Sequence, residues 1–148
     1  IRFMVNRLEQ IDEIYSYFKC YPQIYGGPYF RFLKANIAEH MADCTYLHRD
    51  GAYLAWKIYT RKGKGYERGW VLLDKLVNSR PGTGVGKQLL DEFLARFNDR
   101  TIVLKRLEGN EIAKRLYLSR GFVEEAPKGG FVRMIRAPIS TEETRVNP

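Results

Sequence analysis

The sequence is poor in the residues that build disulfide frameworks and metal sites. It contains two cysteines, Cys20 and Cys44, and two histidines, His40 and His48, among 148 residues. Two cysteines cannot supply the several cross-links of a disulfide-stabilised secreted domain. Neither histidine stands at a spacing from cysteines or carboxylates that is typical of metal ligands, so we expect no bound metal. We expect His48, which lies next to a predicted hairpin, to be exposed.

Long hydrophobic runs are also missing. No stretch of 18 apolar residues occurs, and no secretory signal peptide is recognisable. The sequence therefore predicts a protein without a membrane span and without a membrane partner. Because cysteine is scarce as well, we expect a cytoplasmic protein.

The composition is that of one globular domain. Hydrophobic residues make up 45% of the chain and charged residues 28%, which is ordinary for a globular protein. The length of 148 residues is enough for one hydrophobic core but not for two. We expect a single domain over residues 1–137 and a polar C-terminal tail over residues 138–148.

Positive charge is in excess. The formal net charge is +8 at pH 7. Such an excess can attract acidic partners, which include nucleic acid, an acyl carrier and CoA with its phosphates, and the simpler interpretation is a solvated basic surface. The densest basic segment, Arg61–Arg68, contains the glycines of a predicted hairpin tip.

The spacing of apolar residues predicts the order of the elements. Asp50-Gly51 is a strong hairpin signal, and three consecutive strands around it are expected to form an antiparallel meander. The predicted order is a strand at 1–6, a helix to about 19, a loop at 21–28, a helix from about 28 to 41, strands at 42–48, 53–60 and ending near 77, a helix at 84–97, a strand at 101–107, a helix to about 120, and strands at 122–125 and 131–136.

One segment, Leu76–Leu90, carries the clearest chemical signal. A strand ends in a turn, three glycines follow at alternate positions, and an amphipathic helix begins at once. Backbone N–H groups at the positive end of a helix dipole form a ready site for phosphate. The Walker pattern fails because Pro81 and Gln88 occupy positions that need glycine and a hydroxyl residue, and the dinucleotide pattern fails at its last glycine.

The glycine segment resembles the pyrophosphate loop of the GNAT superfamily of N-acetyltransferases, Arg/Gln-x-x-Gly-x-Gly/Ala. Gly84 and Gly86 fill its two small positions, whereas Pro81 occupies the first position and Arg80 stands one residue early. The segment Asn110–Phe122 matches the second motif of that family, Asn-x-x-Ala-x-x-x-Tyr-x-x-x-Gly-Phe, at every marked position. The two motifs span about a third of the chain, and the N-terminal half resembles the family only in its order of elements.

The resemblance implies an α/β (α+β) GNAT fold, with a mixed, mostly antiparallel central sheet of six to seven strands and about four helices. It implies an acetyl-CoA-dependent N-acetyltransferase that moves an acetyl group from acetyl-CoA to an amine, acting as a monomer or homodimer. The acceptor is a small molecule, a peptide or a nucleic acid, and no motif in the N-terminal half identifies it. The alternative is a basic GNAT-fold protein that modifies or binds nucleic acid.

The residues that the resemblance assigns to acetyl-CoA lie in the strand, the loop and the later helix. Main-chain groups of the strand end hold the pantetheine arm, and the loop holds the pyrophosphate. Asn110 binds the arm, caps its helix, or does both at once. The full set is Leu76, Val77, Asn78, Arg80, Gly82, Thr83, Gly84, Val85, Gly86, Lys87, Asn110 and Ala113.

Two residues are candidates for proton transfer. In the resemblance Tyr117 matches the tyrosine that protonates the departing sulfur; a tyrosine packed in the core is the other interpretation. Asp74 is the candidate base, because a desolvated carboxylate in an apolar strand suits that role. Its alternative is an ion pair with Lys57 or Lys75, in which case Glu67 or a water relay would serve as base.

Two tyrosines in the N-terminal half are open to two interpretations. Tyr25 and Tyr29 stand in and just after the predicted loop at 21–28. In the resemblance this region lines the acceptor pocket, whereas aromatic residues at such spacing also pack in a core.

Overall fold

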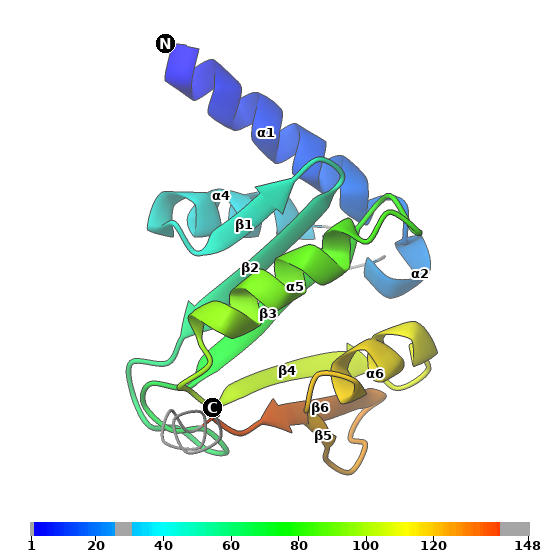
Figure 1. Cartoon of the computed structure of the whole chain (residues 1–148). Helices are drawn as coiled ribbons and strands as arrows, with labels where there is room; N and C mark the ends of the chain where they lie inside the picture. Colours follow the sequence, from blue (N-terminus) through cyan, green and yellow to red (C-terminus); the bar gives the residue numbers. More distant parts are fainter. Residues whose placement is uncertain (1, 26–30, 140–148) are drawn as a thin grey trace, which may run out of the picture. The chain divides into compact units, whose positions relative to one another are not determined.

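The computed structural model describes residues 2–25 and 31–139 (Figure 1). The predicted helix start at Pro28, the candidate Tyr29 and tail residues 140–148 lie outside the described residues. The chain divides into two compact units. Unit 1 comprises Ile1–Trp56 and Lys75–Glu92, and unit 2 comprises Lys57–Asp74 and Phe93–Pro148.

The described residues form six strands in one mixed sheet and five helices. The strand order is β1-β2-β3-β4-β6-β5, with β3 and β4 parallel and the pairs β1–β2, β4–β6 and β5–β6 antiparallel. This confirms the predicted mostly antiparallel sheet. The elements are α1 (Arg2–Phe18), α2 (Pro22–Tyr25), α4 (Leu33–Asp43), β1 (Tyr46–Arg49), β2 (Ala52–Ile58), β3 (Val71–Asn78), α5 (Val85–Arg96), β4 (Ile102–Leu107), α6 (Glu111–Leu118), β5 (Val123–Glu124) and β6 (Phe131–Arg136).

Three predictions for the N-terminal half are wrong. The predicted strand at 1–6 is the first part of α1, because adding turns to a helix that is already nucleated costs little and the alternation over six residues is weak. The predicted loop at 21–28 contains the one-turn helix α2. The predicted strand at 42–48 begins only at Tyr46, because α4 continues to Asp43 and ends at Cys44 in a left-handed conformation.

The core of unit 1 is built where α1 and α4 cover the inner parts of β2 and β3. Phe18 is fully buried, and its ring meets the rings of Tyr25 and Tyr53 edge-on at 4.8 and 6.0 Å. Apolar residues at helical spacing explain why both helices bury one face. The buried members are Ile11, Ile14, Tyr17, Phe18, Leu33, Ile37, Met41, Tyr53, Ala55 and Val77.

Unit 2 is built around the antiparallel pair β4–β6. The register runs from Ile102 opposite Arg136 to Leu107 opposite Phe131. Arg106 is buried in β4, and its guanidinium donates to Glu124 of β5 at 2.6 Å, so the buried charge is paired. No helix in the described part of the chain is long and apolar enough to cross a membrane.

Candidate functional site

The glycine segment forms a fixed loop in unit 1 between β3 and α5. Gly82 and Gly84 adopt φ of 85° and 79°, which is the left-handed region that other residues rarely occupy. A Cβ added to either glycine would meet no atom within 4 Å. These two glycines therefore shape the backbone and leave open space beside it, as a cradle for a ligand requires.

The third glycine has a different role. A Cβ at Gly86, which is buried in the first turn of α5, would lie 3.0 Å from the Cβ of Asn78. Gly86 thus allows the helix to pack against the end of β3. Asn78 in turn accepts a hydrogen bond from the Arg80 N–H at 3.0 Å, and the Thr83 hydroxyl donates to the Arg80 carbonyl at 2.7 Å. The loop is closed by its own side chains.

The end of α5 that faces this loop suits the pyrophosphate of acetyl-CoA. The first N–H groups of a helix have no acceptor within the helix, and they carry the positive end of its dipole. The Val85 N–H has only a long contact of 3.5 Å to the Thr83 hydroxyl. Lys87 is exposed in the same turn. The donors and the open backbone therefore fit a diphosphate.

Arg80, the shifted cationic residue, is engaged elsewhere in unit 1. Its guanidinium lies 2.9 Å from the Asp50 carboxylate in the β1–β2 turn. A Cβ at Gly51 would come within 2.8 Å of the Arg80 side chain, so the stem covers that turn. Both charged groups are more than half exposed, and an ion pair of this kind contributes about 0–1 kcal/mol. Arg80 is thus tied to the hairpin, although weakly.

Two tyrosines that the sequence did not identify as strand partners bind the end of β3. The Tyr25 hydroxyl donates to the Leu76 carbonyl at 3.0 Å, and the Tyr21 hydroxyl donates to the Asn78 carbonyl at 2.5 Å. Burial raises the pKa of Tyr25 to about 12 and also raises the pKa of Tyr21, so both remain donors at neutral pH. No local pattern in the sequence identifies these contacts, because they join residues 57 and 51 positions apart.

These hydroxyls contact the strand segment that the resemblance assigns to the pantetheine arm. Two carbonyls of that segment, those of Leu76 and Asn78, accept these hydroxyls. Val77, between them, has its side chain in the core of unit 1. The Tyr25 ring is partly buried and packs against Phe18 at the edge of the core of unit 1, and its hydroxyl lies on the strand.

Unit 2 carries the residues of the second motif on α6. Asn110 is the N-cap of this helix, and its side-chain oxygen accepts from the Ala113 N–H at 3.2 Å. The capping interpretation is therefore confirmed, and the amide nitrogen of Asn110 is the group that could bind a ligand. Tyr117, one turn after Ala113, is buried, and its ring meets Phe122 edge-on at 5.5 Å. The ring of Tyr117 therefore packs in the core of unit 2, and this packing is compatible with a separate role for its hydroxyl.

The two candidate bases differ in their surroundings. Asp74 is half-buried in β3, and its charge helps to raise the pKa of the Tyr59 hydroxyl, after burial and the neighbouring Tyr66. Glu67 is exposed in the hairpin between β2 and β3, where it faces Lys62 at 3.6 Å. Asp74 is the more shielded carboxylate of the two.

His48, expected to be exposed, is half-buried in a hydrogen-bond network of unit 1. Its Nε2 lies 3.0 Å from the Tyr17 hydroxyl, and its Nδ1 lies 3.1 Å from the Gln10 amide nitrogen. The Tyr17 hydroxyl also donates to Glu13 at 2.8 Å and accepts from the Gly51 N–H at 3.2 Å. The network joins α1 to the β1–β2 hairpin. Among the described residues, no three His, Cys, Asp or Glu side chains are grouped as a metal site would require.

No model of a known protein family matches the sequence, and no curated protein sequence matches it either. Solved structures do match. An acetyltransferase from Thermus thermophilus is 17% identical with a TM-score of 0.66, over 86% of this chain and 90% of that one. A Desulfovibrio desulfuricans protein described as a GNAT-family acetyltransferase is 16% identical with a TM-score of 0.61, over 86% and 90%.

A third match is the PaiA N-acetyltransferase from Thermoplasma acidophilum, whose structure contains coenzyme A. It is 16% identical with a TM-score of 0.60, over 89% of this chain and 92% of that one. At such low identity the matches speak for the arrangement of helices and strands alone. The chain has the fold of the GNAT acetyltransferases.

Proposed function

We propose that this protein is an acyl-CoA-dependent N-acyltransferase that transfers an acetyl group from acetyl-CoA to an amine. The glycine loop of unit 1 carries the proposal. Gly82 and Gly84 leave the backbone open at the positive end of α5, and this arrangement suits a diphosphate. The likeness to a structure that contains coenzyme A supports the same cosubstrate.

The proposed reaction requires two proton movements. The amine nitrogen forms a bond to the acetyl carbon, the bond from that carbon to sulfur breaks, the amine loses a proton and the thiolate gains one. We assign the second movement to the Tyr117 hydroxyl, which donates to sulfur and regains a proton from solvent. Asp74, or a water molecule, accepts the proton of the amine. Loop N–H groups hold the cosubstrate in place.

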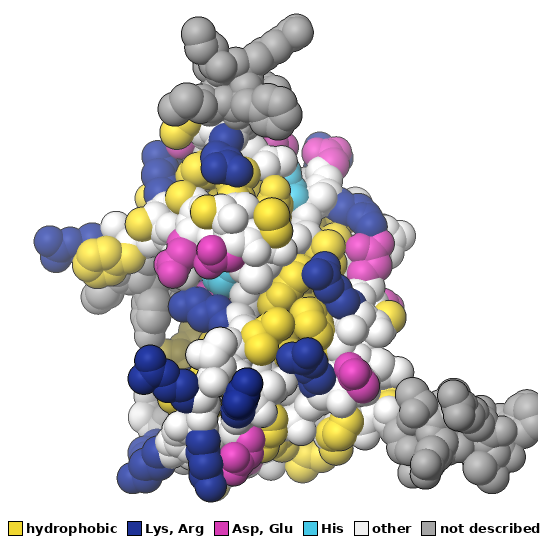
Figure 2. Space-filling model, turned by 90° about the vertical axis from the view of Figure 1, so that its left-hand side faces the viewer, with side chains coloured by type: hydrophobic (Ala, Val, Ile, Leu, Met, Phe, Trp, Pro, Cys, Tyr) yellow, Lys and Arg dark blue, Asp and Glu magenta, His cyan; other side chains and the backbone are white. Residues whose placement is uncertain are grey.

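The acceptor is an amine whose carrier we leave to experiment. Lys and Arg side chains gather in the lower half of the face in Figure 2, with few acidic side chains among them. A net charge of +8 favours an acidic carrier, which includes a nucleic acid. The acceptor panel therefore contains polyamines, acidic and neutral peptides, tRNA and DNA.

Two measurements test the proposal. Calorimetry should detect binding of acetyl-CoA, and the bound cosubstrate should raise the melting temperature, since a ligand at about 100 times its Kd adds about 2.7 kcal/mol to the free energy of unfolding. Labelled acetyl-CoA should then transfer its acetyl group to at least one member of the panel. Absence of binding at millimolar acetyl-CoA would overturn the proposal, and binding without transfer to any amine would leave a CoA-binding protein instead.

A further inference from the structure

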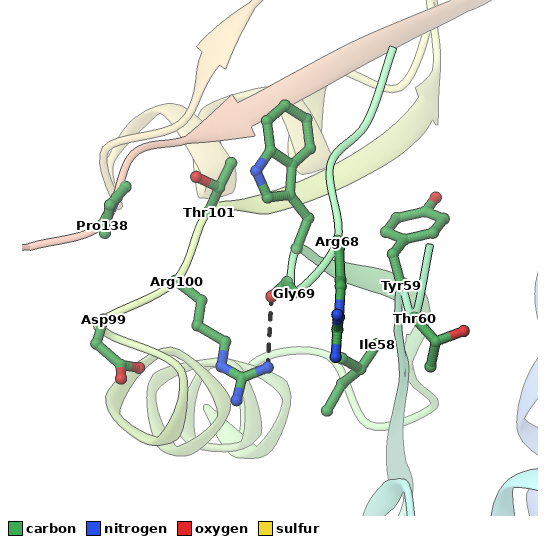
Figure 3. A pocket seen from close by; sticks show the side chains of 10 residues that line it. Ile58, Tyr59, Thr60, Arg68, Gly69, Asp99, Arg100, Thr101 and Pro138 are labelled. Carbon is green, nitrogen blue, oxygen red and sulfur yellow. Dashed lines mark hydrogen bonds between the residues drawn. The ribbon is translucent and has the colours of Figure 1, made fainter. Parts of the chain in front are cut away.

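Unit 2 contains a pocket that none of the residues discussed above as acetyl-CoA or proton-transfer candidates lines. Its volume is about 650 Å³, within the range of small-molecule sites. We call it the arginine pocket, after Arg68 and Arg100, whose side chains both reach toward the space beside Gly69 (Figure 3). It lies between the end of the β2–β3 hairpin and the turn that leads from α5 into β4.

A β-bulge builds one wall of the pocket. Gly69 adopts φ of 90°, its N–H donates to the Tyr59 carbonyl at 2.8 Å, and the Tyr59 N–H donates to the Trp70 carbonyl at 2.9 Å. Gly69 and Trp70 thus lie opposite the single residue Tyr59, and the first of the pair, Gly69, has a left-handed backbone, as in a G1 bulge. The Gly69 carbonyl is free of the strand ladder here and accepts from the Arg100 guanidinium at 3.4 Å. The bulge therefore fixes Arg100 at the pocket.

The two guanidinium groups have donors to spare. A guanidinium offers five N–H donors, and Arg100 uses one of them in that single long hydrogen bond. Arg68 is exposed and forms no hydrogen bond or ion pair with the described residues. Asp99 is the carboxylate on the lining, and it is exposed and forms no ion pair with the described residues. Two arginines and one aspartate leave the lining with a net positive charge.

The rest of the lining combines the apolar side chains of Ile58, Trp70 and Pro138 with the hydroxyl residues Tyr59, Thr60 and Thr101. Trp70 lines the pocket, and the guanidinium of Arg133 lies 6.0 Å from its ring. Ile58, also on the lining, is 40% exposed, which is high for an aliphatic side chain in a strand. A ligand with an anionic end and an uncharged body would contact both kinds of wall.

We propose that the arginine pocket binds a small phosphate monoester. The phosphate would meet Arg68 and Arg100, because two guanidinium groups with free donors match the several oxygens and double negative charge of that group. The organic body would lie against Trp70 and Ile58. The lining shares no residue with the glycine loop, and the proposal holds whether or not the protein transfers an acetyl group.

Trp70 supplies a direct readout of binding. The other tryptophan, Trp56, is 1% exposed in unit 1, so a ligand-dependent change in fluorescence should come from Trp70. The full chain is titrated with inorganic phosphate, glycerol 2-phosphate and AMP at constant ionic strength. We expect saturable changes, with the two organic phosphates binding more tightly than inorganic phosphate because they also contact the apolar wall.

Arg68→Gln is the test variant and Arg61→Gln its matched control. Both side chains are exposed cations of the same hairpin and neither bonds to the described residues, so both variants should fold and lose the same charge. Arg68→Gln should weaken the binding of AMP about tenfold or more, since a charge-assisted hydrogen bond is lost. Arg61→Gln should bind AMP as the parent does, because Arg61 does not line the pocket.

Several outcomes would overturn the proposal. One is the absence of a saturable signal with all three probes at millimolar concentration. Another is an equal loss of AMP affinity in Arg68→Gln and Arg61→Gln. A third is tight binding of a single-stranded oligonucleotide that both substitutions weaken to the same extent. Either result would indicate a general basic surface in place of a specific site. The final outcome comes from calorimetry with acetyl-CoA. If Arg68→Gln weakens the binding of both acetyl-CoA and AMP, the pocket is part of the cosubstrate site and not a separate site.

Discussion

Replacing Gly84 by aspartate and by asparagine tests whether the glycine loop holds phosphate. Gly84 has φ of 79° and open space around its Cα, so the new side chain meets strain in the backbone but no clash. Asparagine and aspartate have the same shape, and both tolerate the left-handed conformation better than other residues do. The two variants therefore have the same shape, and they differ in one negative charge and in the N–H donors of the amide.

The expected magnitudes separate folding from binding. The left-handed backbone costs about 1 kcal/mol in either variant, or a few degrees in melting temperature. The aspartate variant recovers about 0.3–1 kcal/mol of this stability, because its negative charge lies at the positive end of the α5 dipole. Its repulsion from a phosphate charge about 5 Å away is about 1–3 kcal/mol for an effective dielectric constant between 80 and 20. The aspartate variant should thus be at least as stable as the asparagine variant, and it should bind CoA about 5–150 times more weakly than the asparagine variant does.

Calorimetry with CoA measures this difference, and circular dichroism confirms that both variants are folded. The gap between the two affinities should narrow at high salt, because exposed charges are screened. Equal affinities for CoA in the aspartate and asparagine variants at low salt would refute the assignment of the pyrophosphate to this loop. The same comparison at Gly86 is less informative, because any side chain there presses on Asn78.

Three further predictions concern proton transfer and stability. Tyr117→Phe should lower turnover by about two to four powers of ten and leave CoA affinity unchanged, because the ring still packs on Phe122; unchanged turnover removes the hydroxyl from the mechanism. Asp74→Asn should flatten the rise of the rate with pH in a transfer assay, and a parent-like pH profile would exclude the base role. Burial lowers the pKa of His48 in the folded protein, although the charges of Glu13 and Asp50 oppose this shift. As the pH falls, His48 therefore takes up a proton in the unfolded chain before it does so in the folded protein. The free energy of unfolding should thus fall as the pH drops below about 6.5. Urea titrations between pH 7.5 and 5.5 measure that loss, which should shrink in His48→Gln; an identical loss in that variant would assign it to other groups.

The predictions that succeeded depend on neighbours in the sequence. The Asp50-Gly51 hairpin, the Asn110 cap and the glycine loop are each fixed by residues within about one turn of one another, so local patterns suffice. The strand predicted at 1–6 failed for a related reason. Alternation over six residues is a weak local signal, and the longer helical pattern that follows it extends through them as α1.

The sequence by itself determined that a glycine loop joins a strand to a helix and that a capped helix with a tyrosine comes later. The resemblance carried by its two motifs also implied the mostly antiparallel sheet that the structure shows. Only the tertiary structure decided what the side chains bind. Tyr21 and Tyr25 reach carbonyls 57 and 51 residues away, Tyr17 meets His48 across 31 residues, and Arg100 meets Gly69 across 31. Such contacts depend on how distant segments pack, and that packing leaves no periodic pattern in the chain.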